Sequence, residues 1–216
     1  MLINMKHYIK RILLESLNDL VYTDGKFLSN DEKFRKYFKG LRLSDYKNKP
    51  YPKNESDKTN KELKYLKRLK NNKDLVMSSD DIIGRFKVYF NEKNIDYPKL
   101  LVKDLISGSK NFIMKLKHFY NRPRPKQIAK KIGIDLNCSN INSAKTPSYP
   151  SGHTAQSLLI ANVLGDLYPK HKDNLLRIAE EISKSRMVGK VHFPSDVKFG
   201  KKIGIALYKQ YKKNGN

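Results

Sequence analysis

The sequence predicts an all-α protein folded as a helical bundle. Apolar residues recur at spacings of three and four along most of the chain, which is typical of amphipathic helices. No stretch alternates polar and apolar residues as a half-buried strand does, and no segment is repeated. One hydrophobic core can serve a chain of 216 residues, so we expect a single domain over residues 1–216.

The first predicted elements are a basic helix and a polar loop, both within the N-terminal region 1–97. Apolar residues at helical spacing between Ile9 and Leu20 predict an amphipathic helix, which packs on the core or, as the alternative, lies on a membrane surface. Residues 45–60 contain two prolines and almost no aliphatic side chain. They therefore predict a loop, which is the candidate linker of the chain.

Two capping-box spacings predict the next helix starts. A Ser or Thr followed three residues later by an acidic residue can satisfy the free N–H groups at the beginning of a helix. This spacing occurs at Thr59 and Glu62 and again at Ser78 and Asp81, each time before apolar residues at helical spacing. We therefore expect a helix to start at each of these two places.

The strongest helical patterns follow in the C-terminal part of the chain. The predicted segments are, in order, a helix from Pro98 to the sequence NRPRP, an irregular stretch over 126–152, and helices over 153–168, 175–182 and 197–211. The segment 153–168 is apolar on nearly every side. We therefore expect this helix at the centre of the bundle.

Charge and cysteine content bound the function classes. The chain has 45 Lys and Arg against 21 Asp and Glu, a net charge of +24. Such a charge favours weak association with anionic surfaces, although lysines scattered over solvated helix faces explain much of it equally well. Cys138 is the only cysteine, so no intrachain disulfide can form. No uninterrupted apolar stretch suits a secretory signal or a membrane span, so we expect a soluble, cytoplasmic protein.

Two basic residues fall on apolar helix faces. Arg186 continues the stripe of Ala179 and Ile182 by four residues, and Lys117 lies on the apolar face of the helix that starts at Pro98. A buried charge without a partner is costly. We therefore expect an anion, either a carboxylate or a bound ligand, beside Arg186.

The sequence PSGH, residues 150–153, directly precedes the central helix. Gly152 permits a close approach to the backbone, and the free N–H groups at a helix start can bind an anion. His153 would then stand beside that anion. The alternative is that Ser151 only caps the helix and His153 is a surface residue.

The sequence SRMVGKVHFPSD, residues 185–196, places His192 at the end of one helix and Asp196 at the start of the next. A carboxylate within reach of an imidazole fixes its tautomer and stabilises its cationic form. The alternative is that Asp196 is only a favourable charge at a helix N-terminus.

Together these residues resemble the three-block signature of the type 2 phosphatidic acid phosphatase superfamily, which includes bacterial non-specific acid phosphatases and vanadium haloperoxidases. The match places Lys117, Arg124 and Pro125 in K-x6-RP, Pro150 to His153 in PSGH, and Ser185, Arg186, His192 and Asp196 in SR-x5-H-x3-D. A second register with Lys115 and Arg122 also fits the first block, but the RPRP form of the family favours Arg124. The resemblance implies the helical bundle of this superfamily, with the motif-bearing core over about 98–212.

The resemblance also implies roles for these side chains, with no metal ion and no cofactor. His192 would be the nucleophile that forms a phosphohistidine, Asp196 would orient its ring, and His153 would protonate the leaving alcohol and activate the water. The phosphate oxygens would be held by Lys117, Arg124, Ser151, Gly152 and Arg186. The substrate would be a small phosphate monoester, and vanadate would act as an inhibitor.

Other functions share part of this pattern. In a vanadium haloperoxidase, vanadate bound to His192 would be the cofactor, although the chain is short for such an enzyme. A lipid phosphate phosphatase acting peripherally at a membrane and a basic protein that binds nucleic acid or membrane surfaces are the further alternatives. Lys190 departs from the family, where many members have a small residue, and so affects the shape of the pocket. We interpret the remaining histidines as surface residues: His7, His118 and His171.

Overall fold

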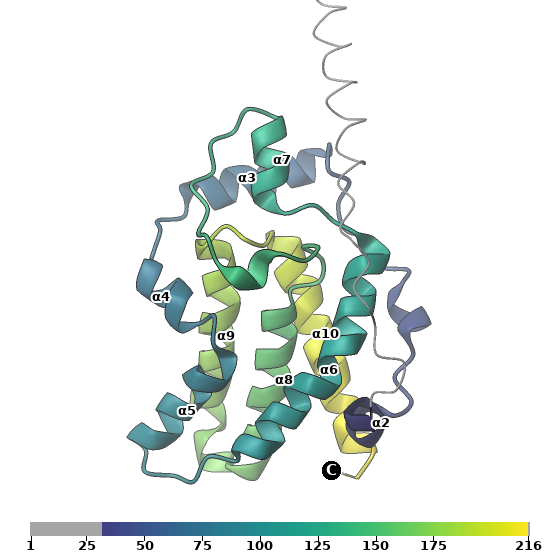
Figure 1. Ribbon diagram of the computed structural model, residues 1–216, viewed down its shortest axis with the longest axis vertical. Helices are drawn as coiled ribbons and strands as arrows, with labels where there is room; N and C mark the ends of the chain where they lie inside the picture. The colour runs from purple at the N-terminus through teal and green to yellow at the C-terminus, as the bar shows by residue number, and fades with distance from the viewer. Residues whose placement is uncertain (1–31, 216) are drawn as a thin grey trace, which may run out of the picture.

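The computed structural model describes residues 32–215, so the helix predicted between Ile9 and Leu20, as well as His7, lies outside the described residues. All regular structure within residues 32–215 is helical, which confirms the prediction of an all-α fold (Figure 1). The α-helices are α2 (Glu32–Phe38), α3 (Asp57–Arg68), α4 (Lys73–Ser78), α5 (Ile82–Glu92), α6 (Lys99–Tyr120), α7 (Pro125–Lys131), α8 (Gly152–Leu167), α9 (Lys172–Val188) and α10 (Pro194–Lys213). Short 3-10 helices lie at Leu43–Tyr46, Asn142–Ala144 and Pro169–His171.

α8 lies at the centre of the bundle and packs against α9, α10 and α6 (Figure 1). Leu159, Ile160, Val163 and Leu164 on successive positions around this helix are all buried, which confirms the prediction of a central helix. Two hydrophobic clusters include residues of α8: one lies towards α2, α6 and α10, and the second lies towards α5 and α9. A helix with buried residues on all sides needs such partners all round.

Glycines on α10 allow it to approach α8 closely. A Cβ atom on Gly200 would lie 2.6 Å from the carbonyl oxygen of Ser151, and one on Gly204 would lie 2.6 Å from that of Ala155. Neither position has room for a larger residue. The close packing brings the start of α10 next to the start of α8, where the proposed site lies.

α6 confirms the prediction of a helix between Pro98 and NRPRP. It ends at Tyr120 because Asn121 adopts a left-handed conformation, with φ of 45°, and donates its N–H to the carbonyl of Lys117 at 2.8 Å. The prolines that follow cannot continue the helix. Neither α6 nor any other helix within residues 32–215 is both long and apolar enough to cross a bilayer.

The helix starts predicted from capping boxes were displaced. α3 begins at Asp57, since the side chain of Ser56 accepts the Thr59 N–H at 3.3 Å, so the loop after Tyr46 is shorter than predicted. α5 is capped by Asp81, whose side chain accepts the Gly84 N–H at 3.0 Å. The Ser and Thr positions chosen from the sequence both lie within helices.

Three short helices were not predicted: α2, which spans Glu32–Phe38, and α4 and α7. α4 spans Lys73–Ser78 and ends at the serine that was expected to start a helix. α7 spans Pro125–Lys131, inside the stretch expected to be irregular, and begins with proline at its first position, where no N–H is required. Elements of six and seven residues are too short to show a helical period in the sequence.

Candidate active site

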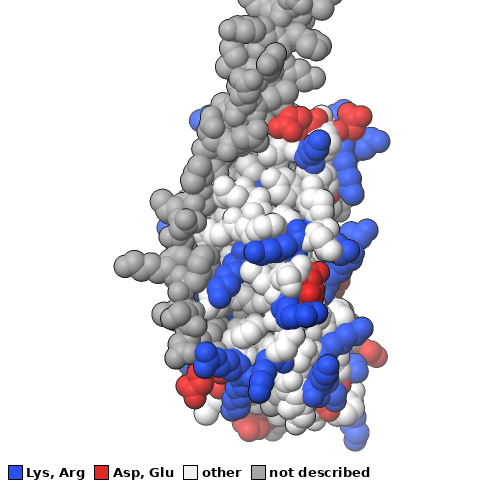
Figure 2. Space-filling view, turned by 90° about the vertical axis from the view of Figure 1, so that its right-hand side faces the viewer, with Lys and Arg blue, Asp and Glu red and all other residues white. Residues whose placement is uncertain are grey.

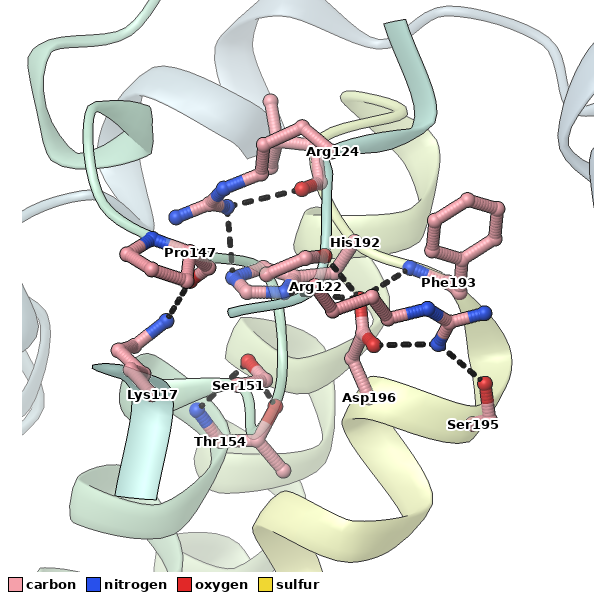
Figure 3. A network of polar contacts seen from close by, with 12 residues as sticks. Lys117, Arg122, Arg124, Pro147, Ser151, Thr154, His192, Phe193, Ser195 and Asp196 are labelled. Carbon is pink, nitrogen blue, oxygen red and sulfur yellow. Dashed lines mark hydrogen bonds and ion pairs between the residues drawn. The ribbon is translucent and has the colours of Figure 1, made fainter. Parts of the chain in front are cut away.

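The three motifs meet at one end of the bundle (Figures 1 and 3). The C-terminal part of α6 brings Lys117 there, and the segment that follows brings Arg124. α8 begins there with Gly152, and the turn from α9 to α10 carries His192. α3 and α7 pack over the same end through a cluster that includes Phe193.

The turn between α9 and α10 determines where His192 lies. Lys190 adopts a left-handed conformation with φ of 56°, and the N–H groups of Val191 and His192 donate to the carbonyl of Arg186 at 3.1 and 3.2 Å. α10 starts two residues later with Pro194 at its first position. The backbone therefore holds His192 between the end of one helix and the start of the next.

His192 and Asp196 form a buried pair, with 3.3 Å between Nδ1 and Oδ2. Asp196 also accepts hydrogen bonds from the Phe193 N–H at 2.8 Å, from Arg122 Nη1 at 2.6 Å and from the Ser148 hydroxyl. Burial by itself raises the pKa of Asp196, but Arg122 and these hydrogen bonds outweigh it and hold the pKa well below its usual range. Asp196 is therefore a carboxylate that keeps the ring proton on Nδ1.

The other ring nitrogen of His192, Nε2, faces Arg124 (Figure 3). Arg124 Nη1 lies 3.0 Å from Nε2 and also donates to the Val191 carbonyl at 2.8 Å. Since a guanidinium can only donate, Nε2 is the acceptor and carries no proton. Burial, together with the charges of Arg124 and Lys117, lowers the pKa of His192 well below its usual value despite the opposing effect of Asp196. The imidazole is therefore neutral, with a lone pair on Nε2.

Lys117, near the end of α6, is also buried, and its Nζ donates to the Pro147 carbonyl at 2.6 Å. Burial, and next the charge of Arg124, lower its pKa well below the usual value. A Cβ atom on Gly152 would lie 3.7 Å from Lys117 Cε and 3.6 Å from a methyl group of Ile113, which are ordinary contacts. Packing within the protein therefore does not require glycine at the start of α8.

Ser151 caps α8, because its hydroxyl accepts from Thr154 Oγ1 at 2.9 Å and from the Thr154 N–H at 3.4 Å. Its own N–H donates to the Asp196 carbonyl at 3.1 Å. The capping interpretation of Ser151 is thus correct. The same residue also ties the PSGH segment to the aspartate that holds His192.

Arg186 and His153 meet on Asp80, a residue that sequence analysis did not single out for the site. Arg186 is fully buried and donates from Nη1 to Asp80 Oδ1 at 2.8 Å and from Nη2 to the Val76 carbonyl at 3.1 Å. His153 Nε2 lies 3.0 Å from the Asp80 carbonyl oxygen and 3.3 Å from Oδ1. Hydrogen bonds from His153, then from Ser143 and Arg186, hold the pKa of Asp80 well below its usual range against the effect of burial. The anion expected beside Arg186 is therefore a carboxylate.

A charged network behind Asp196 was also missed. Arg122 is completely buried, and its Nη1 donates to Asp196 and to Ser195 Oγ, the latter at 2.7 Å. Its Nη2 donates to Glu62 Oε2 at 3.4 Å. Glu62 accepts from the N–H and from the hydroxyl of Ser195, both at 2.8 Å. The structure thus distinguishes the two arginines of RPRP: Arg122 contacts Asp196, whereas Arg124 contacts His192.

The eight residues singled out from the sequence form two groups, and the members of each group are linked by the contacts described above. Lys117, Arg124, Ser151 and Gly152 surround the pair of His192 and Asp196, whereas Arg186 joins His153 through Asp80. Residues 32–215 contain no cluster of three or more His, Cys, Asp or Glu side chains arranged to hold a metal ion.

Two histidines outside these groups were wrongly interpreted as surface residues. His118 and His171 are both half-buried. His171 Nδ1 lies 2.8 Å from the Tyr89 hydroxyl, to which it is hydrogen-bonded.

Comparisons with known proteins point to one family. A family model for the PAP2 superfamily matches residues 102–212. The non-specific acid phosphatase of Salmonella typhi is 41% identical over 64 residues, which are 30% of this chain and 26% of that protein. The acid phosphatase of Zymomonas mobilis is 31% identical over 112 residues, 50% of this chain and 42% of that protein. The chain therefore spans less than half of the length of either relative.

Proposed function

Since this chain belongs to the PAP2 superfamily, we propose that it is a phosphatase that hydrolyses small phosphate monoesters through a phosphohistidine, without a metal ion. One observation carries the proposal: His192 is neutral, with Nδ1 held by Asp196 and an unprotonated Nε2 directed at Arg124. An imidazole in this state is a nucleophile, and a guanidinium beside it binds anions. The acid phosphatases among its relatives support the same activity.

Arg124 and Lys117 would bind the phosphoryl oxygens. Arg124 Nε and Lys117 Nζ donate to the backbone carbonyls of Thr146 and Pro147, at 2.8 and 2.6 Å. A phosphate dianion is a stronger acceptor than a carbonyl, so its binding would compete for these donors. The negative charge would also oppose the lowering of the Lys117 pKa and favour its ammonium form. The missing side chain at Gly152 leaves room for the ligand next to Lys117.

The first chemical step would transfer the phosphoryl group to His192. Its Nε2 lone pair forms a bond to phosphorus while the bond from phosphorus to the ester oxygen breaks, and that oxygen takes a proton from His153. The phosphorylated ring carries a positive charge, which the carboxylate of Asp196 stabilises through Nδ1–H. In the second step His153 takes a proton from water, the water oxygen bonds to phosphorus, and the bond from Nε2 to phosphorus breaks.

Asp80 would position His153 for both steps. The Asp80 carbonyl can only accept, so the proton of a neutral His153 lies on Nε2. Nδ1 is then the nitrogen that takes up a proton and gives it to the leaving oxygen. The nearby carboxylate stabilises the protonated ring, and Arg186 holds this carboxylate in place.

The distribution of surface charge does not favour the alternative of a basic protein that binds nucleic acid or membrane surfaces. Figure 2 shows Lys and Arg spread from one end of this face to the other rather than gathered in one basic patch. In contrast, Lys117, Arg124 and Arg186 are each buried, and Lys117 and Arg124 lie on either side of His192 (Figure 3). Arg186 is already met by the Asp80 carboxylate, whereas Arg124 and Lys117 donate only to neutral acceptors among the contacts described above, which favours an anionic ligand beside these two residues.

Trapping the covalent intermediate tests this function. The wild-type protein should hydrolyse p-nitrophenyl phosphate with EDTA present and should yield an acid-labile, base-stable phosphoprotein after a rapid quench. His192→Ala should lose both the turnover and the label while its circular dichroism is unchanged. His171→Gln removes an imidazole outside the site and should keep both. Undiminished labelling of His192→Ala, or loss of wild-type activity in EDTA, would contradict the proposal.

A further inference from the structure

A basic pocket of about 370 Å³ adjoins the proposed phosphate site. Its lining includes four cationic side chains and two amides, and no Asp or Glu of the described residues lines it. These polar residues are Arg124, Lys126, Lys145, Lys190, Gln127 and Asn140. Arg124 also contacts His192 Nε2, so one side chain of the pocket lining reaches the nitrogen proposed to attack phosphorus.

The loop between α7 and α8 forms a fixed wall of this pocket. The Ser139 N–H donates to the Gly189 carbonyl at 3.0 Å, and Cys138 Sγ lies 3.5 Å from the Lys190 carbonyl, to which it donates. Further along the loop, Arg124 Nε donates to the Thr146 carbonyl at 2.8 Å. The pocket is therefore built by contacts between the α9–α10 turn and this loop.

Lys190 carries the strongest indication of a ligand. Only 5% of this residue is exposed, and no hydrogen bond or ion pair within the described part of the chain engages its ammonium group, which keeps some contact with solvent where the residue lines the pocket. Its charge and that of Lys126 act on Cys138 and lower the pKa of that thiol, while burial, the larger effect, raises it to about 11. Asp135 also acts on Cys138 but does not line the pocket. An ammonium group that faces such a pocket with no carboxylate partner is placed to donate charge-assisted hydrogen bonds to an anion.

We propose that this pocket binds a second phosphate of the substrate, so that the preferred substrates are small phosphate monoesters whose alcohol portion carries another phosphate group. The inference rests on the proposed phosphatase function. Besides Arg124, which is assigned to the reacting phosphate, three lysines line the pocket and can hold a dianion, and two of them, Lys126 and Lys145, lie at its exposed rim and admit it from solvent. A neutral or alkyl leaving group would cover Lys190 without compensating its charge. A carboxylate shares part of the same chemistry and is separated from a phosphate by the experiment.

The test compares three substrates that differ only at the far end of the alcohol: 1,4-butanediol bisphosphate, 4-phosphonooxybutanoate and butyl phosphate. For the wild type we expect kcat/KM to fall in that order, with the bisphosphate at least about tenfold above butyl phosphate, since one charge-assisted hydrogen bond contributes this much. Lys190→Asn removes the cation and suits the left-handed backbone. It should lower the preference for the bisphosphate about tenfold or more.

A double variant, Lys126→Met with Lys145→Met, changes only exposed pocket residues and should also lower the preference. Lys87→Met removes an exposed lysine on α5 and should leave the preference unchanged. Equal kcat/KM for the bisphosphate and butyl phosphate, or a preference that survives both pocket variants, overturns the inference while the phosphatase function stands. A preference for the carboxylate substrate overturns the assignment to a second phosphate. Absence of hydrolysis of all three substrates and of p-nitrophenyl phosphate overturns both proposals.

Discussion

Replacing Arg122 with methionine should destabilise the protein strongly. Arg122 and Asp196 are both completely buried, and Nη1 lies 2.6 Å from Oδ1. The methionine keeps much of the side-chain volume but leaves Asp196 charged, with the Phe193 N–H, the Ser148 hydroxyl and His192 as its remaining partners. Removing one partner of a buried ion pair costs about 3–5 kcal/mol, because the other charge stays buried without compensation.

This loss should depend on pH. In the wild type the pKa of Asp196 lies below the value of about 3.9 expected for the unfolded chain, so its stabilising contribution is complete above that pH and is lost as the pH falls towards the folded pKa. In the variant, burial acts without Arg122 and raises the pKa of Asp196. Protonation then relieves the buried charge, so the difference in stability between the two proteins should shrink as the pH is lowered from 7 to 3.

Urea unfolding followed by circular dichroism measures this difference in the free energy of unfolding at each pH. The matched control is Arg85→Met, which breaks the Arg85–Glu181 pair, whose side chains are 29% and 39% exposed. This control should cost less than about 1 kcal/mol because solvent screens the pair. A loss below about 1 kcal/mol for Arg122→Met at pH 7, or a loss that does not change with pH, would refute the reasoning.

Three further predictions concern the site and the surface. Asp80→Asn should lower kcat at least about tenfold by removing the negative charge that pairs with Arg186 and with His153, although the backbone contact to His153 remains. A kcat within about twofold of wild type would contradict this. Vanadate should inhibit hydrolysis of p-nitrophenyl phosphate competitively, because it resembles the five-coordinate transition state. If the protein with added vanadate instead oxidised bromide with peroxide and showed no phosphatase activity, the haloperoxidase alternative would be favoured. Arg186→Ala should lower kcat/KM by orders of magnitude at any salt concentration. Neutralising the exposed Lys67, Arg68 and Lys70 should instead weaken adhesion to DNA or anionic vesicles, with an effect that fades as salt is raised. Loss of hydrolysis in the triple variant, with hydrolysis intact in Arg186→Ala, would refute the proposed site.

Patterns local in the sequence were enough to predict much of the fold and the identity of the proposed site residues. The helical period is visible within α6 and α8 because each repeats over several turns, and prolines mark where α6 stops. The spacing of His192 and Asp196 around Pro194 likewise predicted a pair across a helix start. The position of Arg186 on an apolar stripe required an anionic partner, since this requirement follows from burial alone.

Only the tertiary structure decided which residues meet. Asp80 reaches Arg186 because the short helix α4, invisible as a period, packs against α9. Arg122 and Arg124 are two residues apart in one motif, yet Arg122 contacts Asp196 on α10 and Arg124 contacts His192 in the α9–α10 turn. Lys190 was visible as a departure from the family, but its pocket exists only because the α7–α8 loop lies against that turn. Each of these contacts joins residues far apart along the chain, and their pairing depends on how the helices pack.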